Sequence, residues 1–187
     1  MSLSRAQRQR IDRIARGRSE EAVFLLEGRR AVRDALAAGV VAELWLRTDL
    51  PEEQRDELAS SAARHGARLL EAGPADFERL GRTVTPQGVL ALVRDTRAPL
   101  VEVVARSGWL LWLDGLQDPG NVGASVRVAL AFGAAGLVVS EGGAHPLGLK
   151  ALRASAGLAL QLPFARASAA DIQSALGQAG RPIWLLE

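Results

Sequence analysis

One segment determines the architecture of the second half of the chain: Asp114-Gly-Leu-Gln-Asp-Pro-Gly-Asn-Val-Gly-Ala-Ser-Val-Arg-Val-Ala-Leu-Ala-Phe-Gly133. It follows the apolar run Trp109–Leu113, which predicts a strand buried on both faces of a parallel sheet. Pro119-Gly120 predicts a turn, and Val122–Phe132 predicts a helix. We expect Asn121 to cap this helix and its exposed N–H groups to favour an anion.

The faces of the predicted helix divide into a core stripe and a polar side. Gly123 and Arg127 are neighbours at a spacing of four, away from the apolar stripe. A glycine below Arg127 would let a bulky substrate approach while the guanidinium presents a planar fork of donors. Close backbone packing is the structural alternative for Gly123. The core stripe comprises Val122, Val126, Ala129 and Leu130.

The rest of the chain predicts two α/β units, because strands and helices alternate in both halves. We expect a basic N-terminal arm over 1–18, a small α/β domain over 19–95, a linker over 96–107 and a parallel-sheet domain over 108–187. Strands are predicted at Val23–Glu27, Val41–Leu46, Ala67–Leu70, Gly88–Val93, Gly136–Ser140, Leu158–Leu162 and Pro182–Leu186, and helices at Arg5–Arg16, Arg30–Ala38, Pro51–His65, Pro74–Leu80, Val101–Ala105, Leu147–Ala154 and Ala169–Gln178.

Composition narrows the class of protein. The formal net charge is only +2, but residues 1–18 contain six arginines against Asp12 alone, which favours a polyanionic partner or, more simply, a solvated helix face. Cysteine is absent and only two histidines occur, so we expect no disulfide and no metal site. The longest apolar stretch, Val128–Val139, is short for a membrane helix, and the N-terminus has no signal-peptide core, so we expect a cytoplasmic protein.

At this point the motifs resemble a known family. Asp118-Pro-x-Asn121-x-Gly123-x-x-x-Arg127-x-Ala129-x-x-Phe132-Gly133 is similar to the first conserved motif of the SpoU, or TrmH-like, branch of the SPOUT methyltransferases. Lys150-Ala-Leu-Arg-Ala-Ser155-Ala-Gly157 resembles that family's next segment. Leu26-Glu27-Gly28 and Pro86-Gln87-Gly88 resemble its substrate-binding domain. The resemblance extends from about residue 7 to residue 187, in the family's order.

The resemblance implies methyl transfer from S-adenosylmethionine to a ribose 2′-hydroxyl of RNA, with rRNA favoured over tRNA. It implies a small RNA-binding domain ahead of a parallel-sheet domain with a trefoil knot, and a homodimer for the full-length enzyme. It also places Asn121 and Arg127 at the reacting ribose as catalytic residues. Since a guanidinium rarely loses its proton, our hypothesis is that Arg127 clamps a phosphate and stabilises the developing alkoxide.

Further site residues follow from the same resemblance and from charge. Glu27 could instead satisfy buried backbone groups, and Ser155 could instead cap a turn. The predicted RNA contacts are Arg5, Arg8, Arg10, Glu27, Arg29, Gln87 and Ser155, and the predicted edge of the cofactor site is Leu185, Leu186 and Glu187.

The sequence also departs from the family, because its later Gly-x-Glu-x-x-Gly and Ser-Leu-Asn motifs are absent. We therefore expect the front part of a longer enzyme, inactive and weak in cofactor binding by itself. One alternative is a non-catalytic RNA-binding protein. Another is an unrelated nucleotide-binding α/β enzyme, although Gly115, Gly120 and Gly123 do not have the spacing of a dinucleotide-binding loop.

Overall fold

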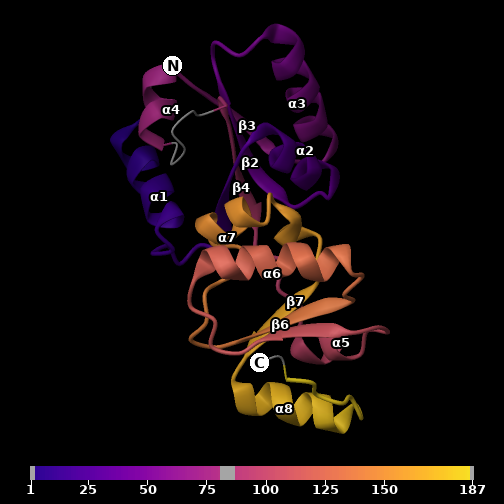
Figure 1. Ribbon diagram of the computed structural model, residues 1–187. Coiled ribbons are helices and arrows are strands. Elements are labelled where there is room, and N and C mark those ends of the chain that lie inside the picture. Colours follow the sequence, from indigo (N-terminus) through magenta and orange to yellow (C-terminus); the bar gives the residue numbers. More distant parts are fainter. Residues whose placement is uncertain (1–2, 81–86, 186–187) are drawn as a thin grey trace.

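The first half of the chain folds around a four-stranded mixed sheet in the computed structural model, which describes residues 3–80 and 87–185 (Figure 1). The strand order is β1-β4-β2-β3, with β2 and β3 parallel and β4 antiparallel to both of its neighbours. The elements are α1 (Arg5–Ala15), β1 (Val23–Glu27), α2 (Arg29–Ala37), β2 (Val41–Arg47), α3 (Glu52–Arg64), β3 (Arg68–Ala72), α4 (Pro74–Leu80) and β4 (Val89–Arg94).

Alternation along the strands sends apolar side chains to both faces of this sheet, so helices cover both. Leu26, Leu44 and Ala91 face α2 and α3, whereas Leu25, Trp45 and Leu92 face α1 and α4. Helix α1 buries Ile11 and Ile14 against this second face. The segment expected to be a basic arm is thus mostly a packed layer of the first domain.

The second half forms a parallel sheet of order β5-β6-β7. Helices α6 and α7 cover one face, and α5 and α8 cover the other. Helix α5 buries Val103 and Val104, so part of the expected linker belongs to this domain. The elements are α5 (Leu100–Val104), β5 (Leu110–Leu113), α6 (Pro119–Ala131), β6 (Gly136–Ser140), α7 (Leu149–Ala154), the 3-10 helix η1 (Leu158–Leu160), β7 (Phe164–Ala167) and α8 (Ala169–Gln178).

Three strand predictions were wrong in detail. Leu158–Leu162 is not a strand: η1 follows the left-handed Gly157, and β7 begins only after Pro163, whose missing N–H suits a strand start. Residues 182–185 pair with no strand in the described chain and are exposed. Strand β5 lies at an edge of the three described strands, so only its last residue, Leu113, is buried.

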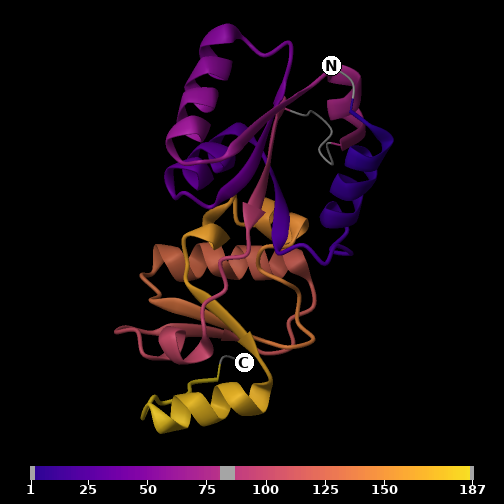
Figure 2. The same cartoon turned by 180° about the vertical axis from the view of Figure 1, so that it is seen from behind.

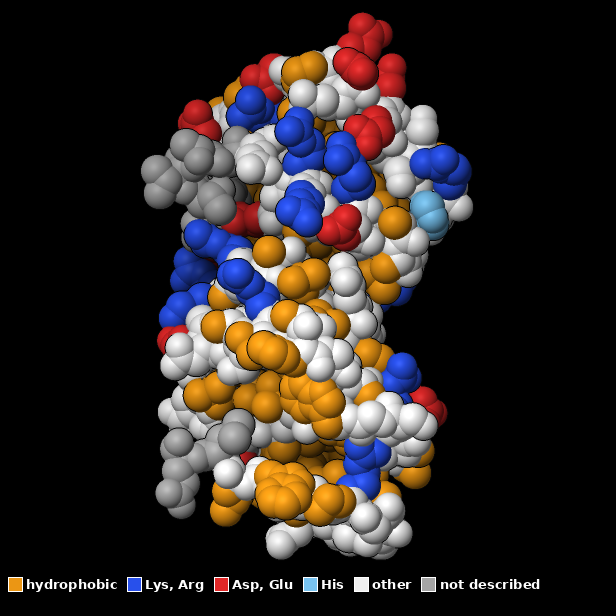
Figure 3. Space-filling view, turned by 45° about the vertical axis from the view of Figure 1, so that its right-hand side comes forward, with side chains coloured by type: hydrophobic (Ala, Val, Ile, Leu, Met, Phe, Trp, Pro, Cys, Tyr) orange, Lys and Arg blue, Asp and Glu red, His pale blue; other side chains and the backbone are white. Residues whose placement is uncertain are grey.

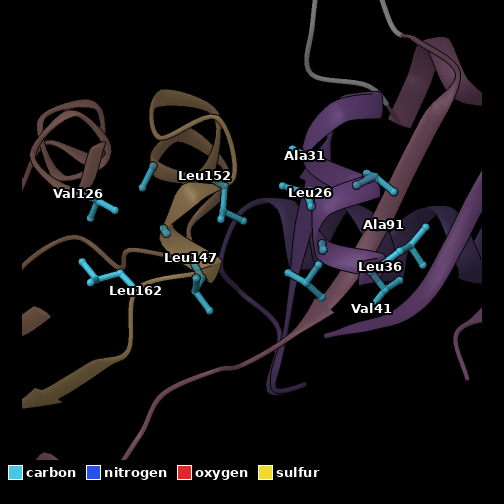
Figure 4. Packing of buried hydrophobic residues seen from close by; sticks show 14 of the residues in the cluster. Leu26, Ala31, Leu36, Val41, Ala91, Val126, Leu147, Leu152 and Leu162 are labelled. Carbon is cyan, nitrogen blue, oxygen red and sulfur yellow. The ribbon is translucent and has the colours of Figure 1, made fainter. Parts of the chain in front are cut away.

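The two domains share one hydrophobic core. A single cluster continues from Leu26 and Ala31 of the first domain to Leu147 and Leu152 of the second (Figure 4). Beside it, the His145 ring stacks on Phe24 of β1 at a centroid distance of 4.5 Å. Seen from behind, β4 runs directly into the segment that enters the second domain (Figure 2). We infer that the relative orientation of the two domains is fixed by this packing and not only by the connecting chain.

Candidate RNA-binding and catalytic site on helix α6

Helix α6 begins one turn earlier than expected because Asp118, not Asn121, is its N-cap. The Asp118 carboxylate accepts the Asn121 backbone N–H at 2.9 Å, and Pro119 occupies the first helical position, where its fixed φ is favourable. Asn121 is therefore inside the first turn, with its side chain exposed. Its amide group is not used in capping and can meet a ligand.

Asn121 and Arg127 lie on one exposed strip of α6. Between them is Ala124, which is also exposed, and the three residues follow at intervals of three. Residues three apart on a helix are neighbours, so the strip is continuous and spans about 9 Å along the axis. The methyl group of Ala124 leaves room between the amide and the guanidinium. Asn121 and Arg127 are also about 120° apart around the axis, so a ligand that contacts both must lie diagonally across Ala124.

Gly123 serves close packing and not substrate access. A Cβ atom at Gly123 would lie 2.4 Å from the Ala151 carbonyl oxygen and 2.6 Å from the Ala154 Cβ, both in or at the end of α7. The neighbours of Gly123 therefore support close backbone packing, which was the structural alternative for this glycine. Helix α7 lies against the flank of α6 next to the exposed strip.

A hydrogen-bonded chain fixes the start of the loop that leads to α6. Ser140, the last residue of β6, donates from its hydroxyl to Asp114 at 2.5 Å and accepts the Trp112 indole N–H at 2.9 Å. The ends of β5 and β6 are thereby joined at the carboxyl edge of the sheet. Ser140 was not among the residues predicted from the sequence, although its place at the end of an apolar strand, before Glu-Gly-Gly, is a signal for it.

Ser155 is fully buried at the C-terminal end of α7. Its hydroxyl donates to the Leu152 carbonyl at 3.1 Å and accepts the Ala159 N–H at 3.4 Å. These bonds cap the turn between α7 and η1. No Ser155 atom faces solvent for RNA to contact, so the geometry supports the capping alternative.

The predicted arginines of α1 differ in how free they are. Arg10 donates to both Glu21 and Glu43, with N–O distances of 2.6–3.0 Å, and the bonds to Glu21 are the main reason that the pKa of Arg10 is raised. Arg8 pairs with Asp76 of α4 at 3.3 Å. Arg5 is exposed and has no ion pair within the described chain. Of the three, Arg5 is the most available to RNA.

Three of the predicted RNA contacts lie at the junction of β1 and α2, next to the start of β4. They are Glu27, Arg29 and Gln87. The Gln87 side-chain carbonyl accepts the Arg29 backbone N–H at 2.9 Å, which satisfies a donor at the start of α2. The Arg29 guanidinium donates to Gln54 at 2.6 Å, and Glu27 is buried. Arg29 and Gln87 are exposed and therefore accessible to a partner.

Surface chemistry differs between the domains. Figure 3 shows Lys and Arg side chains mainly over the first domain and hydrophobic side chains gathered over the second. A cavity of about 510 Å³ between α1 and α4 is lined partly by Arg8, Arg13 and Arg79. Phe132, the C-cap of α6, is 75% exposed, and Trp109, the residue before β5, is 43% exposed, so Trp109 is not the core residue that we expected.

The predicted cofactor edge is not a formed site in the described residues. Leu185 is 86% exposed, and Leu186 and Glu187 lie outside the residues that the structure describes. Within residues 3–80 and 87–185, no cluster of three acidic, histidine or cysteine side chains could hold a metal ion. Among the same residues, no helix has the length and apolar character needed to cross a membrane.

Comparison with known proteins shows which families the two halves of the chain match. Residues 108–187 match the SpoU rRNA Methylase family, and residues 11–91 match the MRM3-like substrate binding domain. An uncharacterized tRNA/rRNA methyltransferase of Mycobacterium ulcerans is 33% identical over 173 residues, which are 83% of this chain and 53% of the relative. The chain thus spans about half the length of that relative.

Solved structures share the fold. The AdoMet-bound rRNA methyltransferase of Sinorhizobium meliloti superposes with a TM-score of 0.84 at 27% identity, covering 96% of this chain and 68% of that one. An RNA 2′-O ribose methyltransferase superposes with a TM-score of 0.70 at 26% identity, covering 97% and 71%. The chain belongs to the SpoU family of RNA methylases, with an MRM3-like substrate-binding domain ahead of the SpoU domain.

Proposed function

We propose that this chain provides the RNA-binding side of an enzyme that methylates a ribose 2′-hydroxyl of rRNA or tRNA. The main support is the exposed strip of Asn121, Ala124 and Arg127 on α6, inside the segment that matches the SpoU family. The similar RNA 2′-O ribose methyltransferase supports the type of reaction. The adjoining match to an MRM3-like substrate binding domain supports a role for the first half of the chain in holding that substrate.

In this proposal, Arg127 and Asn121 position the ribose. A ribose hydroxyl is a weak nucleophile, so orientation and stabilisation of the developing negative charge determine the rate. The Arg127 guanidinium holds the neighbouring phosphate and stabilises the oxyanion, and the Asn121 amide orients the sugar by hydrogen bonding. A guanidinium is a poor general base, so the hydroxyl proton leaves to water and not to Arg127 as the methyl group is transferred.

We propose S-adenosylmethionine as the methyl donor, because the similar Sinorhizobium protein was solved with AdoMet bound. When bound, it supplies an electrophilic methyl group on a sulfonium. The exposed Leu185 does not fit a closed cofactor site, so the chemistry above is limited to the RNA side.

We further propose that the complete protein is a homodimer that joins beside α6. Val128 of α6 and Phe132, its C-cap, have exposed apolar side chains, and the Trp109 indole N–H donates to the Phe132 carbonyl at 3.0 Å. A second copy of the chain would bury this apolar surface. Such an interface would lie on the helix that bears Asn121 and Arg127.

The test is transfer of a tritiated methyl group to rRNA and to tRNA by the protein expressed from its complete reading frame. Arg127→Lys keeps the positive charge but loses the planar fork, so we expect its kcat to fall by about 100-fold while the melting temperature is unchanged. Full activity of Arg127→Lys would refute the clamp. RNA binding by wild-type protein without methylation of any RNA would favour the non-catalytic alternative.

A further inference from the structure

Asp118 uses its two carboxylate oxygens for two different elements. One oxygen accepts the Asn121 backbone N–H at 2.9 Å, and the other accepts the Lys150 ammonium of α7 at 2.7 Å. The Lys150 ammonium and the Asn121 N–H together hold the pKa of Asp118 below its ordinary value. The carboxylate is therefore charged at neutral pH and joins the first turn of α6 to α7.

Gly120 makes this arrangement possible. A Cβ atom there would lie 2.8 Å from the capping oxygen of Asp118 and 3.5 Å from the Cε of Lys150. Any side chain at position 120 would thus press on the carboxylate that holds Asn121. A glycine next to Asn121, on the same turn, thus leaves the Asp118 carboxylate free to keep both partners in the positions seen here.

Helix α7 gives Lys150 a fixed base. Ala151, the next residue, is fully buried, and its carbonyl meets the backbone of α6 at Gly123. The backbone that bears Lys150 is therefore held against α6 two residues from Asn121. The ammonium of Lys150, the only lysine in the chain, can reach Asp118 with little movement of either helix.

We propose that Asp118 and Lys150 are positioning residues, which hold the first turn of α6 so that Asn121 stays in line with Arg127. This inference rests on the function proposed above. The pair does not serve mainly for stability, because both side chains are exposed, at 47% and 67%, and exposed ion pairs stabilise proteins little. Loss of the Asp118–Lys150 pair should therefore lower kcat and leave the free energy of unfolding almost unchanged.

A direct contact between Lys150 and an RNA phosphate is the competing explanation, and substitutions separate the two. Asp118→Asn keeps a good N-cap residue but removes the charge that binds Lys150. Lys150→Gln removes the ammonium. If the two residues act as a pair, each substitution should lower kcat by about tenfold, and the double variant should be no worse than either one.

A direct phosphate contact predicts a different pattern. Lys150→Gln alone would weaken RNA binding and reduce the slope of log affinity against log salt concentration by about one. Asp118→Asn would leave both the affinity and this slope unchanged. Under our proposal KM for RNA stays within about twofold and Lys150→Arg, which can still reach Asp118, recovers most of the turnover. Arg64→Gln, which removes an exposed charge at the end of α3, is the control and should match wild type.

The experiment measures methyl transfer by the complete protein for these variants, and hydrogen exchange of the Asn121 amide in residues 1–187. We expect the Asn121 amide to exchange faster in Lys150→Gln than in wild type. Wild-type kcat in both single variants, or the salt-dependent pattern above, overturns the proposal. An inactive wild-type protein refutes the proposed function instead. Unchanged exchange at Asn121 in Lys150→Gln overturns the positioning role whatever the activity.

Discussion

Two helical glycines should respond to alanine in opposite directions. At Gly123 in α6, a Cβ atom would meet the backbone oxygen of Ala151 at 2.4 Å and the Cβ of Ala154 at 2.6 Å. At Gly177 in α8, a Cβ atom would have no neighbour within 4 Å. Gly123 lies in the body of α6 and Gly177 in the last turn of α8, so alanine should gain at least as much helix propensity at 123 as at 177. The difference between the two substitutions thus isolates the contact between α6 and α7.

The size of the Gly123 effect follows from these distances. Carbon atoms pack at about 3.5–4.0 Å, so the two helices must separate by roughly 1 Å to admit the methyl group. Overpacking costs about 1–3 kcal/mol, and here the cost is at the upper end, about 2–3 kcal/mol, because the obstacles are backbone atoms and an alanine, which cannot rotate away. The gain in helix propensity offsets about 1 kcal/mol. We expect a net loss of about 1–2 kcal/mol in the free energy of unfolding.

Thermal and urea unfolding of residues 1–187 measure both changes. Gly123→Ala should lower the melting temperature by about 2–8 °C, and Gly177→Ala should raise it by up to about 4 °C. If Gly123→Ala is as stable as wild type, the close-packing argument is refuted. A stable Gly123→Ala protein with weakened RNA binding would restore the idea that this glycine makes room for the substrate.

Two further predictions concern the domain interface and assembly. Burial, and next the positive charge of Arg166, lower the pKa of His145 from 6.5 to about 4. The unfolded chain therefore takes up a proton first as the pH falls, and stability should drop by about 2 kcal/mol between pH 7.5 and 5. In urea unfolding, His145→Leu should lose this pH dependence and His65→Gln should keep it; equal slopes in all three proteins would contradict the assignment. Phe132→Ser should shift the complete protein from dimer to monomer in light scattering, and an unchanged mass would exclude that surface.

Local patterns predicted most helices and strands, because their information lies within a few residues. Ile11 and Ile14 at a spacing of three predicted α1, and the structure has a helix there. The same pattern could not show that α1 covers the sheet, because its partners Phe77 and Leu80 lie more than sixty residues away. For the same reason, an arginine such as Arg10 looks free in the sequence and is bound to carboxylates in the fold.

Some errors came from reading apolar runs as strands. Leu158–Leu162 is largely apolar because it packs into the core that the domains share. Ala159 in the 3-10 helix and Leu162 just after it are both buried there, although neither lies in a strand. Periodicity cannot separate these cases in so short a segment. At the site, the motif singled out Asn121 and Arg127, but only the fold shows that Asp118 is the cap and that Ser155 is enclosed.

Helix α7 joins the proposed RNA-binding domain to the candidate site. At one end it meets α6 through Lys150 and Ala151. At the other end, Gly157 has a φ of +83° and would place a Cβ atom 2.8 Å from that of Ala31 in α2, so this turn touches the first domain directly. Close-packed contacts transmit displacement because they have little room to yield. We therefore expect a displacement of α2 to reach α7, and through it the Asp118 contact that holds Asn121.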